Sequence, residues 1–121
     1  MKIIAVTPFH GRENISKIFW QNVKDIGLDV IAIVSDKPNK LLAEKYALKV
    51  IEHPNNPLGD KWQQGIYALR DYEFTHLLFI GSDDLISHRL LKLYEREVRK
   101  NGTKYIGLMD AVAIDHKTKL F

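Results

Sequence analysis

Short apolar runs alternate with helix-spaced segments along the whole chain. Four of these runs are continuous and short, which is typical of strands buried on both faces of a sheet: residues 2–6, 29–35, 48–53 and 75–80. The third run is the least apolar, so we expect it near an edge of the sheet. A fifth strand is predicted at 104–109, and the apolar run at 111–115 is compatible with a sixth.

Helical spacing of apolar residues fills the intervals between the strands, at 15–26, 39–47, 59–71 and after Ser87. Asn39 and Ser87 are predicted N-caps, because a short polar side chain can accept a hydrogen bond from a free amide of the first turn. Gly27 and the pair at 101–102 are predicted stops. In the third helix, Trp62, Ile66 and Leu69 share one face, which indicates that Trp62 packs in the core.

Strands that alternate with helices predict an α/β fold, a three-layer αβα Rossmann-like arrangement with a mostly parallel sheet, in a single domain over residues 1–121. In such sheets ligands bind beyond the carboxyl ends of the strands, where the strand order reverses. Polar clusters follow the first, second and fourth strands, at 7–12, 35–36 and 81–84. If the first and fourth strands are neighbours, all three clusters face one crevice.

Composition narrows the class of protein. A chain of 121 residues, 45% of them hydrophobic, suffices for one domain with its own core, and the absence of cysteine excludes disulfides and thiolate metal sites. The net charge of +3 is small, and acids interrupt the densest basic stretch, 94–104, so we interpret it as a solvated helix face and expect no nucleic-acid partner. No run approaches the ~20 apolar residues of a membrane helix, and the apolar run at the N-terminus is shorter than that of a secretory signal, so we interpret it as a strand. We therefore expect a cytoplasmic protein without an integral membrane segment.

Two adjacent carboxylates, Asp83 and Asp84, follow the most apolar strand. Such a pair suits a hard divalent cation, which takes oxygen ligands and often only one or two carboxylates plus substrate phosphates. The alternative is a pair of acids that stabilises the start of a helix. Glycine-rich phosphate-binding motifs and the nucleophile-elbow pattern are both missing, and the five histidines show no pair at metal-ligand spacing.

Three segments together resemble the nucleotide-binding half of GT-A fold glycosyltransferases, most closely family 2: "IIAVTPFHGREN" (3–14), "NNPLGDKWQQGI" (55–66) and "THLLFIGSDDLI" (75–86). The last one is similar to the strand that ends in the metal-binding DxD motif. The resemblance implies a nucleoside-diphosphate-sugar donor, with a UDP-sugar expected first, an unknown acceptor, and Mn²⁺ or Mg²⁺. It also implies that the sheet is of the nucleotide-diphospho-sugar transferase type.

Carried over by position, the resemblance implies distinct roles for residues at the strand ends. Thr7, Pro8 and His10 would line the base and ribose pocket, Asp36 would meet the base, and Lys61 would lie near the diphosphate. Asp83 and Asp84 would hold the metal, and the implied nucleotide-sugar site as a whole contains Thr7, Pro8, His10, Arg12, Asp36, Lys61, Ser82 and Asp83.

The sequence also departs from the family pattern. Gly81 stands at the first acid of DxD, so the contact of that acid is lost or passes to Ser82 or Asp84, and Trp62 and Gln63 replace a common Arg–Asn pair. Family members usually continue for about as many residues again, which supply the acceptor site and the catalytic base, so we expect a fragment of a longer protein, a minimal viral or phage-like enzyme, or half of a split protein. Asp110 is the weak candidate for a catalytic residue, and a plain loop acid is the commoner alternative. A non-catalytic nucleotide-sugar-binding module and an interaction domain therefore remain open.

Overall fold

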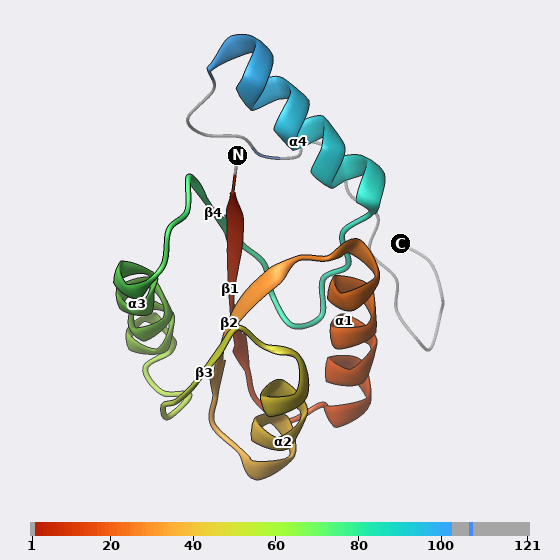
Figure 1. The fold of residues 1–121 in the computed structure, drawn as a ribbon. Coiled ribbons are helices and arrows are strands. Elements are labelled where there is room, and N and C mark those ends of the chain that lie inside the picture. The colour runs from red at the N-terminus through yellow and green to blue at the C-terminus, as the bar shows by residue number, and fades with distance from the viewer. Residues whose placement is uncertain (1, 103–106, 108–121) are drawn as a thin grey trace.

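The computed structural model describes residues 2–102 and residue 107, and in this part of the chain strands and helices alternate. In chain order the elements are β1 (Ile3–Phe9), α1 (Glu13–Ile26), β2 (Asp29–Val34), α2 (Lys37–Tyr46), β3 (Lys49–Glu52), α3 (Leu58–Ala68), the 3-10 turn η1 (Leu69–Asp71), β4 (His76–Phe79) and α4 (His88–Asn101) (Figure 1). The strands predicted at 104–109 and 111–115, and Asp110 with them, lie outside the described residues.

The sheet has the strand order β3-β2-β1-β4, and every described pairing is parallel. This confirms the predicted fold class, the position of the third strand at an edge and the pairing of the first strand with the fourth. Because β1 is followed in the chain by β2 on one side and has β4 on the other, the strand order reverses at β1. The carboxyl end of β1 is therefore the expected place for a ligand.

β1 continues to Phe9, beyond the predicted end at residue 6, so Thr7 and Pro8 belong to the strand. Proline has no amide hydrogen and is poorly tolerated between two neighbouring strands. Here the ladder between β1 and β4 ends at the Val6–Phe79 pair, whereas the ladder to β2 continues through Pro8 to Phe9. Pro8 therefore pairs with one strand only, and its missing amide hydrogen is tolerated.

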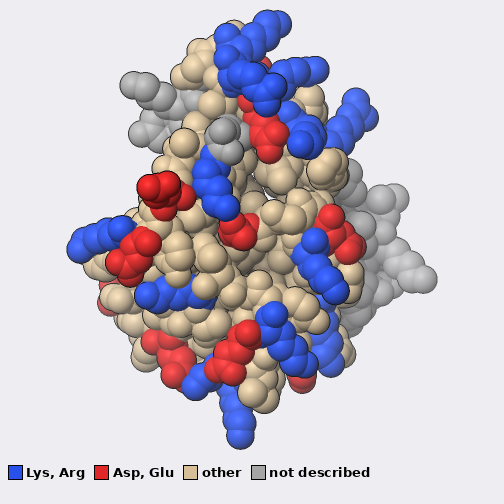
Figure 2. Space-filling view, viewed as in Figure 1, with Lys and Arg blue, Asp and Glu red and all other residues tan. Residues whose placement is uncertain are grey.

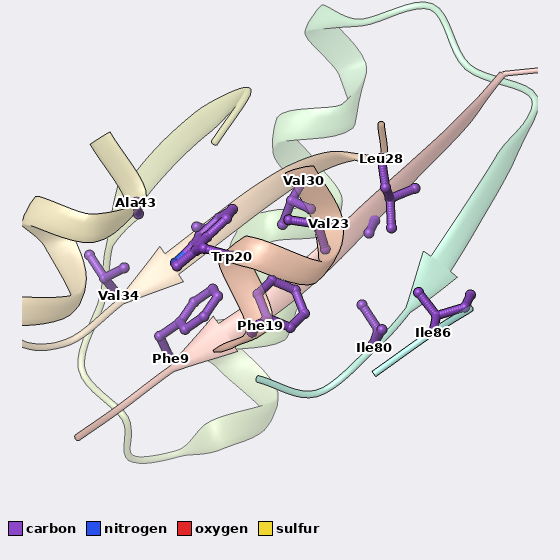
Figure 3. Close-up of a cluster of buried hydrophobic side chains, with 12 residues drawn as sticks. Phe9, Phe19, Trp20, Val23, Leu28, Val30, Val34, Ala43, Ile80 and Ile86 are labelled. Atoms are coloured by element: carbon purple, nitrogen blue, oxygen red, sulfur yellow. The ribbon is translucent and has the colours of Figure 1, made fainter. Parts of the chain in front are cut away.

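Helices cover both faces of the sheet, with α1 and α2 on one face and α3 on the other (Figure 1). On the first face, three aromatic rings of Phe9, Phe19 and Trp20 pack with centroid separations of 5.1–5.3 Å between α1 and the sheet (Figure 3). All three side chains are essentially buried. These aromatic contacts hold α1 against β1.

On the opposite face, α3 turns Lys61, Gly65 and Ala68 toward the sheet. The prediction that Ile66 shares the core-facing side with Trp62 is wrong, because Ile66 is 37% exposed. Trp62 itself is half-buried and packs against the apolar layer, as predicted. Ile66 faces away from the sheet because the neighbouring Gly65 faces it. A Cβ at Gly65 would lie 2.4 Å from Val6 Cγ1 and 2.6 Å from Ile33 Cδ1. The missing side chain lets the helix backbone approach the strands.

The helix ends correct one predicted cap and confirm three others, including the predicted stop at 101–102, since Gly102 ends α4 in a left-handed conformation. Asn39 does not cap α2: the cap is Asp36, whose Oδ1 accepts a hydrogen bond from the Asn39 amide at 2.9 Å. Both residues suit a cap, and Asp36 takes the role because it stands directly before the first helical turn. Ser87 caps α4 as predicted, through a 3.0 Å bond from the Leu90 amide, and Gly27 ends α1 in a left-handed conformation.

Basic side chains gather over α4 in the space-filling view (Figure 2). Its outward residues are exposed, namely Arg89, Lys92, Arg96, Arg99 and Lys100, and Lys92 pairs with Glu95 at 3.6 Å. The opposite side of the helix contributes Leu90, Leu91 and Tyr94 to the core. No helix in the described part of the chain is long and apolar enough to cross a membrane.

The close contact at Gly65 makes a prediction for stability. Gly65→Ala should lower the free energy of unfolding by about 1–3 kcal/mol, because the added methyl group overpacks against Val6 and Ile33. Urea denaturation measures this change. Gly59→Ala is the matched control in the same helix, since its Cβ would meet nothing within 4 Å and alanine favours helix. Equal stability of the two variants would contradict the packing argument.

Candidate functional site

The loops after β1, β2 and β4 meet at the carboxyl edge of the sheet and are joined by polar contacts. The amide of Gly11 donates to Oδ2 of Asp36 at 2.7 Å, which connects the loops after β1 and β2. Arg12 Nη1 lies 3.3 Å from Oδ2 of Asp83, which connects the loops after β1 and β4. The three polar clusters therefore come together as the strand order requires.

Asp36 is the most heavily bonded carboxylate of this edge. Besides the Gly11 amide, it accepts hydrogen bonds from the backbone amide of Asn39 at 2.9 Å and from the Asn39 side chain at 3.0 Å. Burial raises the pKa of Asp36, but these hydrogen bonds and the nearby His10 together outweigh it, so the pKa lies below its usual value of 3.8. The carboxylate thus holds the β1 loop and the first turn of α2. The predicted contact of Asp36 with a nucleotide base stays a prediction.

Lys61 is fully buried, with 0% of the residue exposed. Its Nζ donates to the carbonyl oxygen of Phe9, to Oγ of Ser35 at 3.1 Å and to Oδ1 of Asn55 at 3.1 Å. Burial lowers the pKa of this ammonium to about 8, against the raising effect of the Asp36 charge. All three N–H groups are used inside the protein, so a diphosphate contact, as the resemblance implies, requires Nζ to leave these partners.

Thr7, Pro8 and His10 occupy three different environments. Thr7 is fully buried, and its hydroxyl has no hydrogen-bond partner among the described residues. Pro8 is half-buried, whereas His10 is exposed beyond the strand, with Nδ1 2.6 Å from Oγ of Ser35. Of these three residues, only His10 is exposed to solvent.

The segment after β4 folds back on itself in a tight turn. The amide of Asp84 donates to the Gly81 carbonyl at 3.1 Å, and the Gly81 amide donates to Oδ2 of Asp84 at 3.0 Å. Ser82 is buried at 8% exposure, whereas the Asp83 side chain is 52% exposed and faces Arg12. The two like charges are thus held by different partners, one by its own turn and one by the β1 loop.

The carboxylates of Asp83 and Asp84 both turn toward Gly81. A Cβ at Gly81 would stand 2.9 Å from Oδ2 of Asp84 and 3.1 Å from Oδ1 of Asp83. Two carboxylate oxygens fit Mg²⁺ or Mn²⁺ when water and phosphate complete the shell. Among the described residues no group of three or more His, Asp or Glu could hold an ion without such help.

A groove of about 770 Å³ lies beside this edge, at the ends of β2 and β3 and along α2. Ser35 and Asp36 form one wall, and the other lining residues are Val34, Lys37, Lys40, Leu41, Glu44, Glu52, His53 and Pro54. Asp83 does not line it. Sequence reasoning missed the α2 side of this groove, because these residues read as an ordinary polar helix face. It also gave no role to Asn55, whose contact with Lys61 becomes visible only in the fold.

The fold resembles a solved structure, the crystal structure of S. aureus TarS 1-349. The TM-score is 0.63 at 18% sequence identity, and the match covers 84% of this chain and 33% of the solved TarS chain, so this chain spans about one third of the length of that solved chain. A scan of protein-family models and a search of curated proteins match nothing to this sequence. The likeness supports the α/β fold with a parallel sheet, while membership in the GT-A fold glycosyltransferases and in family 2 stays a prediction.

The lowered pKa of Asp36 makes a prediction for the pH dependence of stability. A carboxyl group with a folded-state pKa below its unfolded value stabilises the protein above the unfolded value and loses this contribution as the pH falls through the folded one. Asp36→Asn should therefore lower the free energy of unfolding by about 1–2 kcal/mol at neutral pH, because a charge-assisted acceptor is lost. The difference from wild type should begin to shrink as the pH falls below the usual pKa of 3.8, and it should be lost below the lower folded-state pKa, where the folded wild type is protonated too.

Denaturation at a series of pH values measures this difference. Asp71→Asn is the matched control and should show at most a small change. It removes a carboxylate that is 70% exposed and that pairs with Lys49 at the start of β3. An Asp36→Asn defect of the same size at acid and neutral pH would contradict the role given to the charge.

Proposed function

We propose that this chain is the donor-binding domain of a glycosyltransferase, which transfers a sugar from a nucleoside-diphosphate sugar to an acceptor with the help of Mn²⁺ or Mg²⁺. The observation that carries the proposal is the meeting of Arg12, Asp83 and Asp84 at the point where the strand order reverses, in a fold like that of a glycosyltransferase. A UDP-sugar is the donor we expect first, from the resemblance of the three sequence segments.

In this proposal each loop has a separate task. Asp83 and Asp84 would hold the cation, which when bound neutralises the negative charge that develops on a diphosphate leaving group. Arg12, 3.3 Å from Asp83, can turn its guanidinium from that carboxylate to a phosphate, because both groups accept its planar donors. Asp36 holds the β1 loop through Gly11, and in this proposal His10 of that loop would lie beside the base and ribose.

A binding test with nucleotides decides the proposal. Thermal unfolding is followed with UDP, GDP, CDP and dTDP, each with and without Mn²⁺. A ligand at a hundred times its Kd adds about 2.7 kcal/mol to the free energy of unfolding, which raises the melting temperature of a chain of this size by several degrees. We expect one diphosphate to give this shift, and to give it only with the metal.

Asp83→Ala should abolish the metal-dependent shift and leave the fold intact, because the side chain is 52% exposed and its ion pair with Arg12 is a surface pair. Asp71→Ala is the control for a lost negative charge away from the site. If Asp83→Ala responds to nucleotide and Mn²⁺ like wild type, the metal site is refuted. If none of the four diphosphates shifts wild type, nucleotide binding is refuted as well.

A second candidate function is nucleotide-sugar binding without transfer, which is favoured by glycine rather than an acid at position 81. Slow hydrolysis of the donor separates the two, because an active transferase passes some of its sugar to water. Release of free sugar that depends on Asp83 supports transfer. Tight binding without any release supports the binding module.

A further inference from the structure

Lys61 is a buried cation that joins the carboxyl ends of three strands. Its Nζ contacts the carbonyl oxygen of Phe9 at the end of β1, Oγ of Ser35 after β2 and Oδ1 of Asn55 after β3. A buried ammonium is costly unless its donors are satisfied, and here three acceptors surround its three hydrogens. These contacts span 52, 26 and 6 residues of sequence, so one charged group fixes loops that are remote along the chain.

Ser35 passes this arrangement on to His10. Its Oγ lies 3.1 Å from Lys61 Nζ, 2.6 Å from His10 Nδ1 and 3.2 Å from the Phe9 carbonyl oxygen. A charged lysine only donates, so Ser35 accepts from it and has a single hydrogen left for Phe9 or His10. His10 must take the complementary role, as donor or acceptor. The orientation of the Ser35 hydroxyl, and with it the state of the His10 ring, depends on Lys61.

We propose that Lys61 is a positioning residue of the candidate site, whose buried ammonium orients the Ser35 hydroxyl and, through it, the imidazole of His10. Lys61 would act on a nucleotide through His10 and not by touching the diphosphate. The effect on nucleotide affinity rests on the proposed function, whereas the coupling between Lys61, Ser35 and His10 is a property of the ligand-free chain.

This coupling depends on pH because Lys61 itself loses its proton near pH 8. The charge of Asp36, in the loop after β2, acts on Lys61 directly, and the loop after β3 adds the neutral amide of Asn55. His10, in the loop after β1, reaches Lys61 only through Ser35. Burial lowers the pKa of Lys61 to about 8. A neutral amine has one hydrogen fewer and a free lone pair, so above that pH Ser35 can donate to Nζ. His10 then loses Ser35 as a donor and must itself donate.

The ring nitrogen chemical shifts of the histidines, followed by NMR from below to above pH 8 in the ligand-free protein, test this coupling. We expect the nitrogens of His10, unlike those of a histidine outside this network, to show a second inflection centred near pH 8. His88 is the internal control, because it is exposed at the start of α4 and has no hydrogen bond to this network among the described contacts. Absence of the second inflection from wild-type His10 would overturn the proposal.

Two variants separate the coupling from a merely structural role. Lys61→Met keeps the length of the side chain without the charge, and Ser35→Ala keeps Lys61 but removes the connecting hydroxyl. Both should lose the second inflection of His10, and Ser35→Ala gives the result even if Lys61→Met fails to fold. Persistence of the inflection in Ser35→Ala would show that His10 senses another group, which contradicts the proposal.

Nucleotide affinity gives a second readout. With the diphosphate that shifts wild type, Lys61→Met should raise the Kd roughly tenfold, the equivalent of one lost hydrogen bond. Lys49→Met is the control, since Lys49 pairs with Asp71 at the opposite edge of the sheet. An unchanged Kd in Lys61→Met would contradict the proposed effect of Lys61 on nucleotide binding. If wild type binds none of the nucleotides, the proposed function fails, and the NMR result still decides the coupling.

Discussion

The parallel pairing of β1 with β2 on one side and β4 on the other is the constraint on which the rest of this structure depends. Parallel strands end at the same edge of a sheet, so the pairing brings the loops that follow residues 9, 34 and 79 to one place. The ladder to β4 stops at Val6, which leaves the end of β1 free to carry Pro8 and the loop beyond it. The contacts of Gly11 with Asp36 and of Arg12 with Asp83 follow from this geometry.

The second layer is built by a helix that turns a lysine, a glycine and an alanine toward the sheet. Gly65 permits the close approach of α3, and the same approach carries Lys61 beneath the ends of β1 and β2. Burial of a single charge would destabilise the layer if its hydrogen bonds were unmade. Here the loops provide the three acceptors, so the cation and the loops stabilise one another. Helix packing and the geometry of the candidate site are therefore parts of one arrangement.

The adjacent carboxylates of Asp83 and Asp84 are each stabilised by a separate hydrogen-bond donor. Asp84 is bonded to the amide of Gly81 in its own turn, and Asp83 faces Arg12 across the strand-order reversal. Both residues are exposed, and the guanidinium of Arg12 lies 3.3 Å from Oδ2 of Asp83. In the proposed function this ion pair would be exchanged for a metal and a diphosphate.

The order of strands and helices, the parallel sheet and the caps at Ser87 and Gly27 were predictable from the sequence alone, because hydrophobic periodicity and capping depend on residues a few positions apart. The pairing of β1 with β4 and the meeting of the strand-end loops followed as a hypothesis from the same pattern. The tertiary structure alone decided that Asp36 caps α2 in place of Asn39, that Gly65 turns Ile66 away from the sheet, and that Lys61 is buried. Local patterns assign a lysine to solvent, whereas the partners of Lys61 at Phe9 and Ser35 are 52 and 26 residues away and come within reach only when the sheet has formed.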